Sequence, residues 1–548
     1  MKAVILDGYV DEPAHHGAPP YISTYPRYIA GALKDAGLQK EQIRYFTIDE
    51  IREDNHKYSA VIESDFLIVS TGMAVPVSSV GGDYMKQEEM EKISTKHKGF
   101  SVIGGPVRFG VLHGGGEVSR DIPDTFDFKA VDGDVETTTF DLLNNGFEGF
   151  NERNRTKEEL ERWAKKGAFI VEQHPNYPEY IITEIKIGRG CPYNCSFCVE
   201  PLYGKPVFRE PEKVVEEIKE LNKYGINDFR LQAPNFLTYG GDGVKPNPEA
   251  MLKLYRGINE AVDNLETLHL DNFNAHTVSE FPERSKKCIE IISKYNTPGD
   301  TCSLGLESAD EEVQEQNNIS ITNEECFEAV KLLNDIGGFR TDNGKSLPKL
   351  LPGINFVYGL KGQTEKTFKK NYDFLRRILE ENLILRRINL RQVSTHPGTE
   401  MEELGDRLVR EHKNLFKKWK KKIREDIDRP MLERVAPKGT IIRNVYTEFR
   451  DGKTTFARPL GSYPLLIGLR EEYKRGIKMD IAVTDYGYRS ITGVKYPLNP
   501  NEASMRELKS IPGIGAKRAG NIVIKRPYES LEQFLDKFGE DFKKYFGL

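Results

Sequence analysis

The chain has 548 residues, of which 38% are hydrophobic and 30% charged, which excludes a disordered or fibrous protein and predicts roughly three to five globular domains. Six cysteines exclude a disulfide scaffold, and no stretch approaches the ~20 apolar residues that cross a bilayer, so we expect a cytoplasmic protein with no membrane partner. The net charge of −5 argues, taken alone, against a nucleic-acid partner.

Charge is unevenly distributed along the chain. Residues 405–548 hold 31 Lys and Arg against 19 Asp and Glu, a balance of +12, while the remaining residues carry −17. In a chain whose remaining part is acidic, such a basic C-terminal quarter either binds a polyanion or forms a solvated basic face.

The first 150 residues alternate short apolar runs with helical patterns. Continuous β-branched runs closed by glycine or proline are typical of parallel strands covered by helices on both faces. Residues 1–150 therefore predict an α/β, Rossmann-like doubly wound domain, with its ligand crevice beyond the carboxyl ends of the strands. Residues 151–180 are charged and contain proline, and we expect a linker there. The predicted strands are 3–6, 43–48, 66–70 and 101–103, with a helix over 25–36.

From residue 181 to 400 the alternation of strand and helix continues at a longer period. Six such repeats predict a partial (βα)6 barrel, with chemistry at the carboxyl ends of its strands. The candidate strands are 181–188, 228–233, 267–275, 301–306, 354–360 and 388–394.

Three further regions follow the predicted barrel. Residues 401–430 predict a basic helical linker, which includes the run Lys417-Lys418-Trp419-Lys420-Lys421-Lys422. Residues 431–498 alternate β-type residues with glycine turns, which predicts a small antiparallel β-barrel. Residues 499–548 predict helices broken at Pro512-Gly513-Ile514-Gly515, a helical hairpin.

The strongest chemical signal is Cys191-Pro192-Tyr193-Asn194-Cys195-Ser196-Phe197-Cys198, a CxxxCxxC after the first barrel strand. Three thiolates this close can each bind one iron of a cubane [4Fe–4S] cluster and leave the fourth iron open. Structural zinc normally needs four ligands, and Cys288, Cys302 and Cys326 are scattered. A zinc site and a set of buried thiols remain the alternatives at this point.

With this motif the chain resembles the radical S-adenosylmethionine (SAM) superfamily. The resemblance implies that Cys191, Cys195 and Cys198 bind a [4Fe–4S] cluster, whose free iron chelates SAM. One-electron reduction would then cleave a C–S bond of SAM and give a 5′-deoxyadenosyl radical. It also implies a one-electron reductant as partner, such as ferredoxin or flavodoxin, and places Phe197 where the backbone meets the adenine.

Later segments match the same superfamily in order along the chain. Ser303-Leu304-Gly305-Leu306-Glu307-Ser308 resembles the strand that supports the polar end of SAM, so Glu307 and Ser308 are expected at the cofactor. Residues 357–364 and 396–399 resemble its "GLPGET" and "PGT" segments. The usual "GGE"-like segment is replaced by Leu231-Gln232-Ala233-Pro234-Asn235, where Gln232 either accepts a hydrogen bond from the methionyl amine or is a satisfied core amide.

An α/β domain ahead of a radical barrel resembles the cobalamin-dependent members of that superfamily. Glycines at strand ends allow the backbone to approach a large flat ring, because a Cβ there would clash. The residues expected at cobalamin are Pro20, Gly72, Gly104, Gly105 and Gly133. The cobalt-binding "DxHxxG" spacing is absent, so His15 and His16 are interpreted as ordinary loop histidines rather than cobalt ligands.

The C-terminal regions resemble nucleic-acid-binding modules. Residues 439–496 resemble the TRAM barrel of tRNA methylthiotransferases, although residues 1–190 contain no cysteine for the second cluster of those enzymes. Its cations and aromatic rings suit single-stranded RNA, or the rings form the core of the barrel. Residues 508–520 resemble a helix-hairpin-helix motif, in which Gly513, Gly515, Lys517 and Arg518 would contact a phosphate unless the motif only packs domains.

Three functional hypotheses follow from these patterns. The first is a cytoplasmic, cobalamin-dependent radical SAM enzyme, expected to be a methyltransferase, that methylates or otherwise modifies an unactivated carbon of tRNA or rRNA. The second is a radical SAM enzyme that acts on a small molecule or peptide without cobalamin. The third is a cluster-containing nucleic-acid-binding protein without catalysis.

Overall fold

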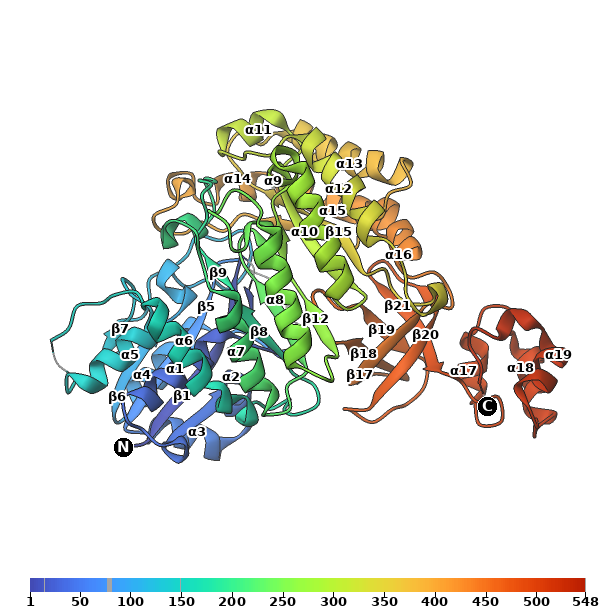
Figure 1. Cartoon of the computed structure of the whole chain (residues 1–548), viewed down its shortest axis with the longest axis horizontal. Helices are drawn as coiled ribbons and strands as arrows, with labels where there is room; N and C mark the ends of the chain where they lie inside the picture. Colours follow the sequence, from blue (N-terminus) through green and yellow to red (C-terminus); the bar gives the residue numbers. More distant parts are fainter. Residues whose placement is uncertain (14, 76–80, 148, 548) are drawn as a thin grey trace.

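The computed structural model describes residues 1–13, 15–75, 81–147 and 149–547. Figure 1 shows an N-terminal α/β region, a central barrel region, a small C-terminal β-barrel and a terminal group of helices. This is the fold class expected from the sequence, an α/β protein with a parallel N-terminal sheet and a five-stranded C-terminal barrel.

The N-terminal sheet is parallel, with the strand order β4-β1-β5-β6-β7. Renumbered within this sheet, the order is 2-1-3-4-5, so the topological switch point lies between β1 and β5. The four predicted strands are present, and β1 and β5 extend beyond their predicted ends. The strands are β1 (Ala3–Glu12), β4 (Ile43–Thr47), β5 (Phe66–Met73), β6 (Phe100–Gly104) and β7 (Phe128–Lys129), with β2 (His15–His16) antiparallel to β1.

Helices cover this sheet and join it to the barrel. They are α1 (Thr24–Asp35), α2 (Ile48–Glu53), α3 (Asn55–Ile62), α4 (Gln87–Lys96) and α5 (Val135–Asn144). The segment 151–180, expected as a linker, instead contains α6 (Lys157–Lys166) and the 3₁₀ helix η3 (Ala168–Gln173). Trp163 and Phe169 of this segment are fully buried, because its apolar residues recur on one helical face and pack with α1.

The central region is an open barrel of parallel strands. β3 (Tyr21–Ile22), from the N-terminal region, pairs with β8 and extends the order to β3-β8-β11-β12, while β13-β14-β15-β16 form the other half. The predicted third strand is broken between β12 and β13 at Leu270 and Asp271. All six predicted strands are otherwise present: β8 (Ile182–Lys186), β11 (Asp228–Gln232), β12 (Thr267–His269) with β13 (Asn272–Phe273), β14 (Asp300–Glu307), β15 (Leu350–Tyr358) and β16 (Arg387–Gln392).

The outer helices of this barrel are amphipathic and bury their apolar faces against the strands. They are α7 (Pro211–Asn222), α8 (Pro248–Ala261), α9 (Ala275–Glu280), α10 (Pro282–Tyr295), α11 (Glu311–Gln316), α12 (Asn323–Gly337) and α13 (Glu365–Glu380). Within the described residues no helix is long and apolar enough to span a bilayer.

The basic segment after the barrel is several helices rather than one. It comprises α14 (Arg407–Glu411), α15 (Lys413–Ile423), a π-helical turn over residues 424–428 and α16 (Arg429–Val435). The small barrel that follows is closed in the order β17-β18-β19-β21-β20, and its β19–β21 pair is parallel where an antiparallel barrel was predicted. Its strands are β17 (Ile441–Asp451), β18 (Thr454–Pro459), β19 (Leu466–Leu469), β20 (Lys478–Tyr486) and β21 (Ser490–Tyr496).

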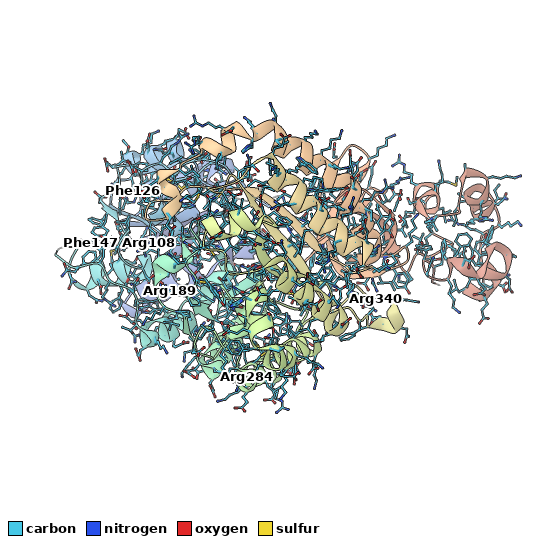
Figure 2. All side chains as sticks on the ribbon, turned by 90° about the horizontal axis from the view of Figure 1, so that it is seen from above. Arg108, Phe126, Phe147, Arg189, Arg284 and Arg340 are labelled. Carbon is cyan, nitrogen blue, oxygen red and sulfur yellow. The ribbon has the colours of Figure 1, made fainter. Side chains whose placement is uncertain are left out.

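The terminal helices are α17 (Met505–Ser510), α18 (Ala516–Ile524) and α19 (Leu531–Phe538). They form an apolar cluster of their own, which continues into the small barrel through Ala482 and Val494. Figures 1 and 2 show this group standing away from the rest of the molecule, on the side where Arg340 is labelled.

Candidate functional site

A cavity of about 200 Å³ lies between the carboxyl ends of the barrel strands and the N-terminal region. Three regions of the chain form its walls. The N-terminal region contributes Glu12, Pro13, His16, Ala74 and Val75, and the small barrel contributes Tyr463. The central barrel contributes most of the loop from Cys191 to Glu200, residues that follow β11 or lie around β13, residues 319–321 and the ends of β14 to β16.

The three predicted cysteine ligands line this cavity together. Their loop leaves and rejoins the barrel through a short hairpin, β9 (Gly188–Arg189) with β10 (Val207–Phe208). Ser196 anchors the loop, because its Oγ donates to Asn317 Oδ1 at 2.7 Å and its backbone N donates to Asn317 O at 3.0 Å. The sequence therefore holds three half-buried free thiols on one fixed loop.

Burial raises the pKa of these thiols, to about 11 for Cys191 and about 12 for Cys195, and the charges of nearby acids and thiolates add to the shift. The pKa of Cys198 is also well above its usual range for these reasons. Three thiolates here therefore need a bound cation to balance them. Among the described residues, no group of three or more His, Cys, Asp or Glu side chains is placed to hold a single metal ion.

Glu307 presents a buried carboxyl group to the same cavity. It ends β14 at a bulge, with the left-handed φ of 61°, and its Oε2 atom is buried without a hydrogen-bond partner among the described residues. Burial raises the pKa of Glu307 to about 8, while the positive charge of Arg391 opposes the shift. A buried polar atom with no partner is rare in folded proteins, and here it offers a place for a cationic ligand group.

The other predicted SAM residues differ in position. Phe197 lines the cavity. Gln232 ends β11 and is buried, but it is not among the cavity residues, and its Nε2 has no hydrogen-bond partner in the described part of the chain. Ser308 also lies outside the cavity wall, and its Oγ accepts a hydrogen bond from the backbone N of Asp310 at 3.1 Å. Ser308 is thus occupied in the turn before α11.

The predicted cobalamin residues of the N-terminal region do not line the cavity. A Cβ on Gly72 would lie 2.1 Å from Val107 N, one on Gly104 2.7 Å from Val135 Cβ, and one on Gly133 2.6 Å from Arg153 O. The chain's own atoms fill the spaces that were expected to face a ring.

The last two predicted cobalamin residues are likewise used within the fold. Gly105 has a φ of 96°, and a Cβ there would lie 3.2 Å from Thr71 O. Pro20 accepts a hydrogen bond from Ile182 N at 2.9 Å, where β3 joins β8. The side chain of His15 is outside the described part of the structure, while His16 lines the cavity.

Arg391 and Tyr463 are among the cavity residues that sequence reasoning did not place in this site. Arg391 lies near the end of β16, and a charged residue at the carboxyl end of a barrel strand was the available signal. Tyr463 was expected either to stack on RNA or to belong to the core of the small barrel. It lies in the β18–β19 connection, which reaches into the central barrel at the break between β12 and β13.

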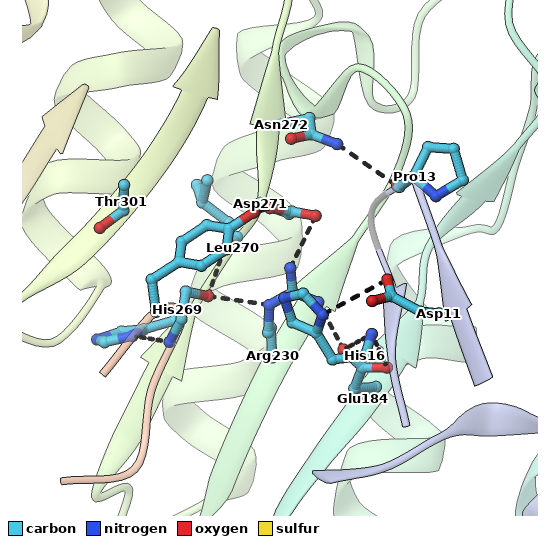
Figure 3. Close-up of polar contacts among 12 residues, drawn as sticks. Asp11, Pro13, His16, Glu184, Arg230, His269, Leu270, Asp271, Asn272 and Thr301 are labelled. Atoms are coloured by element: carbon cyan, nitrogen blue, oxygen red, sulfur yellow. Dashed lines mark hydrogen bonds and ion pairs between the residues drawn. The ribbon is translucent and has the colours of Figure 1, made fainter. Parts of the chain in front are cut away.

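Beneath the cavity lies a buried polar junction of the three regions (Figure 3). Arg230 pairs with Glu184 at 2.5 Å and with Asp271 at 2.7 Å, and its Nε donates to Ser462 Oγ at 3.0 Å. His16 N donates to the Glu184 carboxylate at 2.9 Å, and Tyr463 OH donates to Asp271 Oδ1 at 3.1 Å. The junction fixes the small barrel against the floor of the cavity.

The predicted phosphate-binding residues of the terminal helices are exposed together. Gly515 precedes α18, and a Cβ on it would meet no other atom. Lys517 is exposed, while Arg518 Nη1 donates to Gly513 O at 2.7 Å across the hairpin. The backbone N–H groups at the start of α18 thus face solvent, as a phosphate contact would require.

Comparison with known proteins supports a family and gives no substrate. The radical SAM superfamily model matches residues 185–375. An uncharacterized protein of Archaeoglobus fulgidus is 40% identical over 535 residues, covering 97% of this chain and 96% of that protein. Another uncharacterized protein, from Methanocaldococcus jannaschii, is 40% identical over 514 residues, covering 90% and 93%.

More distant likenesses cover parts of the molecule. The tRNA-2-methylthio-N(6)-dimethylallyladenosine synthase of Bdellovibrio bacteriovorus is 23% identical over 235 residues, 43% of this chain and 46% of that enzyme. Among solved structures, the radical SAM methyltransferase TsrM of Kitasatospora setae has a TM-score of 0.48 and 14% identity, covering 82% of this chain and 79% of that chain.

Proposed function

We propose a function from one premise: the chain belongs to the radical SAM superfamily, in one family with the two archaeal proteins of similar length. It is a radical SAM enzyme, and we propose that it modifies an unactivated carbon of RNA, with methylation as the expected outcome. The observation that carries this proposal is a single cavity that joins the three cysteines, a tyrosine of the small barrel and the Glu307 carboxyl, whose Oε2 has no hydrogen-bond partner among the described residues.

The residues of the cavity fit the cofactors of this superfamily. Cys191, Cys195 and Cys198 would hold a [4Fe–4S] cluster, and the orphaned Glu307 carboxyl would accept a hydrogen bond from the methionyl ammonium of SAM. When bound, the reduced cluster and SAM supply a 5′-deoxyadenosyl radical, which removes a hydrogen atom from the substrate. The partner proposed for the reduction is a ferredoxin or flavodoxin.

The chain's own residues would orient the substrate and keep water away from this chemistry. The Arg391 guanidinium makes no ion pair with a described acid, so it is available to an anionic or carbonyl group of the substrate. Tyr463 lies at the floor of the cavity, where its hydroxyl is held by Asp271.

Cobalamin is the proposed second cofactor, at the wall that the N-terminal region contributes. Pro13 and Ala74 follow β1 and β5, the two strands at the topological switch point, where α/β domains bind ligands. The predicted glycines lie against the chain's own atoms and outside the cavity wall, so support comes from the position of the wall alone. Protein produced with cobalamin supplied should show corrinoid absorbance after purification. If that absorbance is absent, cobalamin is not a cofactor, while the proposed SAM chemistry is unaffected.

RNA is the proposed substrate because the small barrel borders the cavity and carries exposed aromatic residues, Phe449 and Tyr488. A relative that is 23% identical over 235 residues is named for a tRNA modification.

The test uses reconstituted full-length protein with dithionite, and it measures 5′-deoxyadenosine with unfractionated tRNA, with rRNA and with mixed nucleosides. We expect substrate-dependent turnover with one RNA class only. Full turnover with nucleosides would overturn the RNA assignment. Mass spectrometry of nucleosides from cells with and without the gene then identifies the modified base.

A further inference from the structure

A second hollow, of about 250 Å³, lies where β16 begins and where α16 meets the small barrel. Four arginines line it: Arg386 and Arg387 at the start of β16, Arg458 on β18, and Arg489 in the β20–β21 turn. Tyr463 lines both this hollow and the cysteine cavity, so one tyrosine ring separates the two.

The positive charges of this hollow are only partly balanced. Arg458 pairs with Glu448 at 2.7 Å, and Asp428, the one acid that lines the hollow among the described residues, pairs with Arg424. Arg386, Arg387 and Arg489 form no ion pair with any described acid. Three guanidinium groups thus share one hollow with a single described carboxylate, Asp428, which is already paired with Arg424.

Their hydrogen bonds are also incomplete. Arg386 Nη2 donates to Tyr463 O at 2.7 Å, but its Nε is buried without a partner among the described residues. Arg387 Nε donates to Asn389 Oδ1, and its guanidinium lies 4.0 Å from the centre of the Tyr463 ring. Donors remain for a ligand.

Electrostatics favours an anion in this position. Burial and, to a smaller extent, the charge of the nearby Arg489 together lower the pKa of Arg386 to about 10 and that of Arg387 to about 9. An anion would relieve this repulsion and bind the unused donors. Phosphate fits best, because the planar guanidinium donates two parallel hydrogen bonds to its oxygens.

We infer that this arginine hollow binds a backbone phosphodiester group of the RNA substrate. The inference rests on the proposed function and adds a place where that substrate is held. Tyr488, which is 54% exposed, lines the hollow and offers a ring on which a neighbouring base can stack. A nucleotide bound there would lie next to the Tyr463 ring. The cysteine cavity begins on the other side of that ring.

The test measures binding of a fluorescein-labelled, mixed-sequence 20-nucleotide RNA to the full-length protein by anisotropy, over a range of salt concentrations. The variants are Arg489→Gln and the double variant Arg386→Gln/Arg489→Gln. Arg256→Gln is the matched control, since Arg256 is an exposed residue on α8, far along the chain from the hollow, and the substitution removes the same charge. Thermal unfolding of each variant confirms that it is folded.

We expect the double variant to bind about tenfold more weakly, the loss typical of hydrogen bonds to a charged group. The slope of log Kd against log salt should fall by roughly 0.7 for each RNA phosphate that the variant no longer neutralises, while Arg256→Gln keeps the slope of the wild type. Unchanged affinity and slope in both hollow variants would overturn the inference and leave the RNA substrate standing.

Two further outcomes separate this inference from the proposed function. If the wild-type protein cleaves SAM but does not bind the RNA at 50 mM salt, the RNA substrate and the phosphodiester site are both wrong. If pyrophosphate binds the wild type and not the double variant, while both bind RNA equally, the hollow takes a small anion and the inference is again wrong.

Discussion

The cysteine cavity and the polar junction beneath it both bury ionisable side chains. The two regions differ in how these side chains are paired. In the junction, the Arg230 guanidinium pairs with two carboxylates and a hydroxyl, all of them almost completely buried. In the cavity, Glu307 Oε2 has no partner among the described residues. A buried charge is costly unless it is paired, so the junction stabilises the assembly of three regions, while the cavity is completed by ligands.

The largest effect that tests this comparison is loss of the cluster. Cys191→Ala, Cys195→Ala and Cys198→Ala should each reduce bound iron and 5′-deoxyadenosine formation to background, because each removes one of three ligands. Since these thiols are only half-buried, the urea midpoint of the apo-protein should move little. Cys326→Ala, a buried cysteine on α12 outside the cavity, is the control that should keep the iron. Retention of SAM cleavage in a Cys191→Ala protein would refute the assignment.

Removal of a charge should cost far more stability in the junction than in the cavity. Arg230→Gln leaves Glu184 and Asp271 buried without their cation, which typically costs about 3–5 kcal/mol. Arg391→Gln removes the same charge from the cavity and should cost less than about 1 kcal/mol, because Arg391 forms no ion pair with a described acid. Urea unfolding at pH 7 compares the two variants, and equal losses would break the distinction between the regions.

The sequence predicted those features that depend on neighbours along the chain. The spacing of Cys191, Cys195 and Cys198 and the period of the barrel strands are local patterns, and the structure contains both. Tyr463 reaches Asp271 across 192 positions of the chain, and no local pattern encodes such a contact. The break between β12 and β13, into which the Tyr463 connection inserts, was missed for the same reason.

The glycines show a second limit of sequence reasoning. Glycine is required wherever backbone must approach closely, and the approaching atoms are as often those of the chain itself as those of a ligand. Gly72 and Gly104 looked like ligand-facing residues, and the structure places Val107 and Val135 against them. Residue type alone could not distinguish these two cases.

Gly72→Ala sharpens this point within the N-terminal region. The φ of 121° at Gly72 is strained for alanine, and its Cβ would lie 2.1 Å from Val107 N, so we expect a loss of roughly 2–4 kcal/mol. Gly146→Ala is the matched control, because Gly146 also has a positive φ but no atom of the described residues lies within 4 Å of its Cβ. The loss should be the same whether or not cobalamin is supplied. A loss seen only with cobalamin present would restore Gly72 to a ligand site.

Asp228 provides the most specific test, because it is a buried acid outside the cysteine cavity that forms no ion pair with a described cation. Burial raises its pKa to about 7, so the folded protein keeps a proton there that the unfolded chain loses near pH 4. The wild type should therefore lose stability as the pH rises from about 4 to 7, by at most ~1.4 kcal/mol per pH unit. The Asp228→Asn side chain does not ionise, so the urea midpoint of this variant, measured relative to the wild type, should rise across this window and level off above pH 7.

A constant difference would show that Asp228 is ionised in the fold. Burial without a cation partner would then not by itself keep a carboxyl group neutral. The distinction between the cavity and the junction would then fail. The Glu307 carboxyl, whose Oε2 has no partner among the described residues, could in that case also stay charged without a ligand.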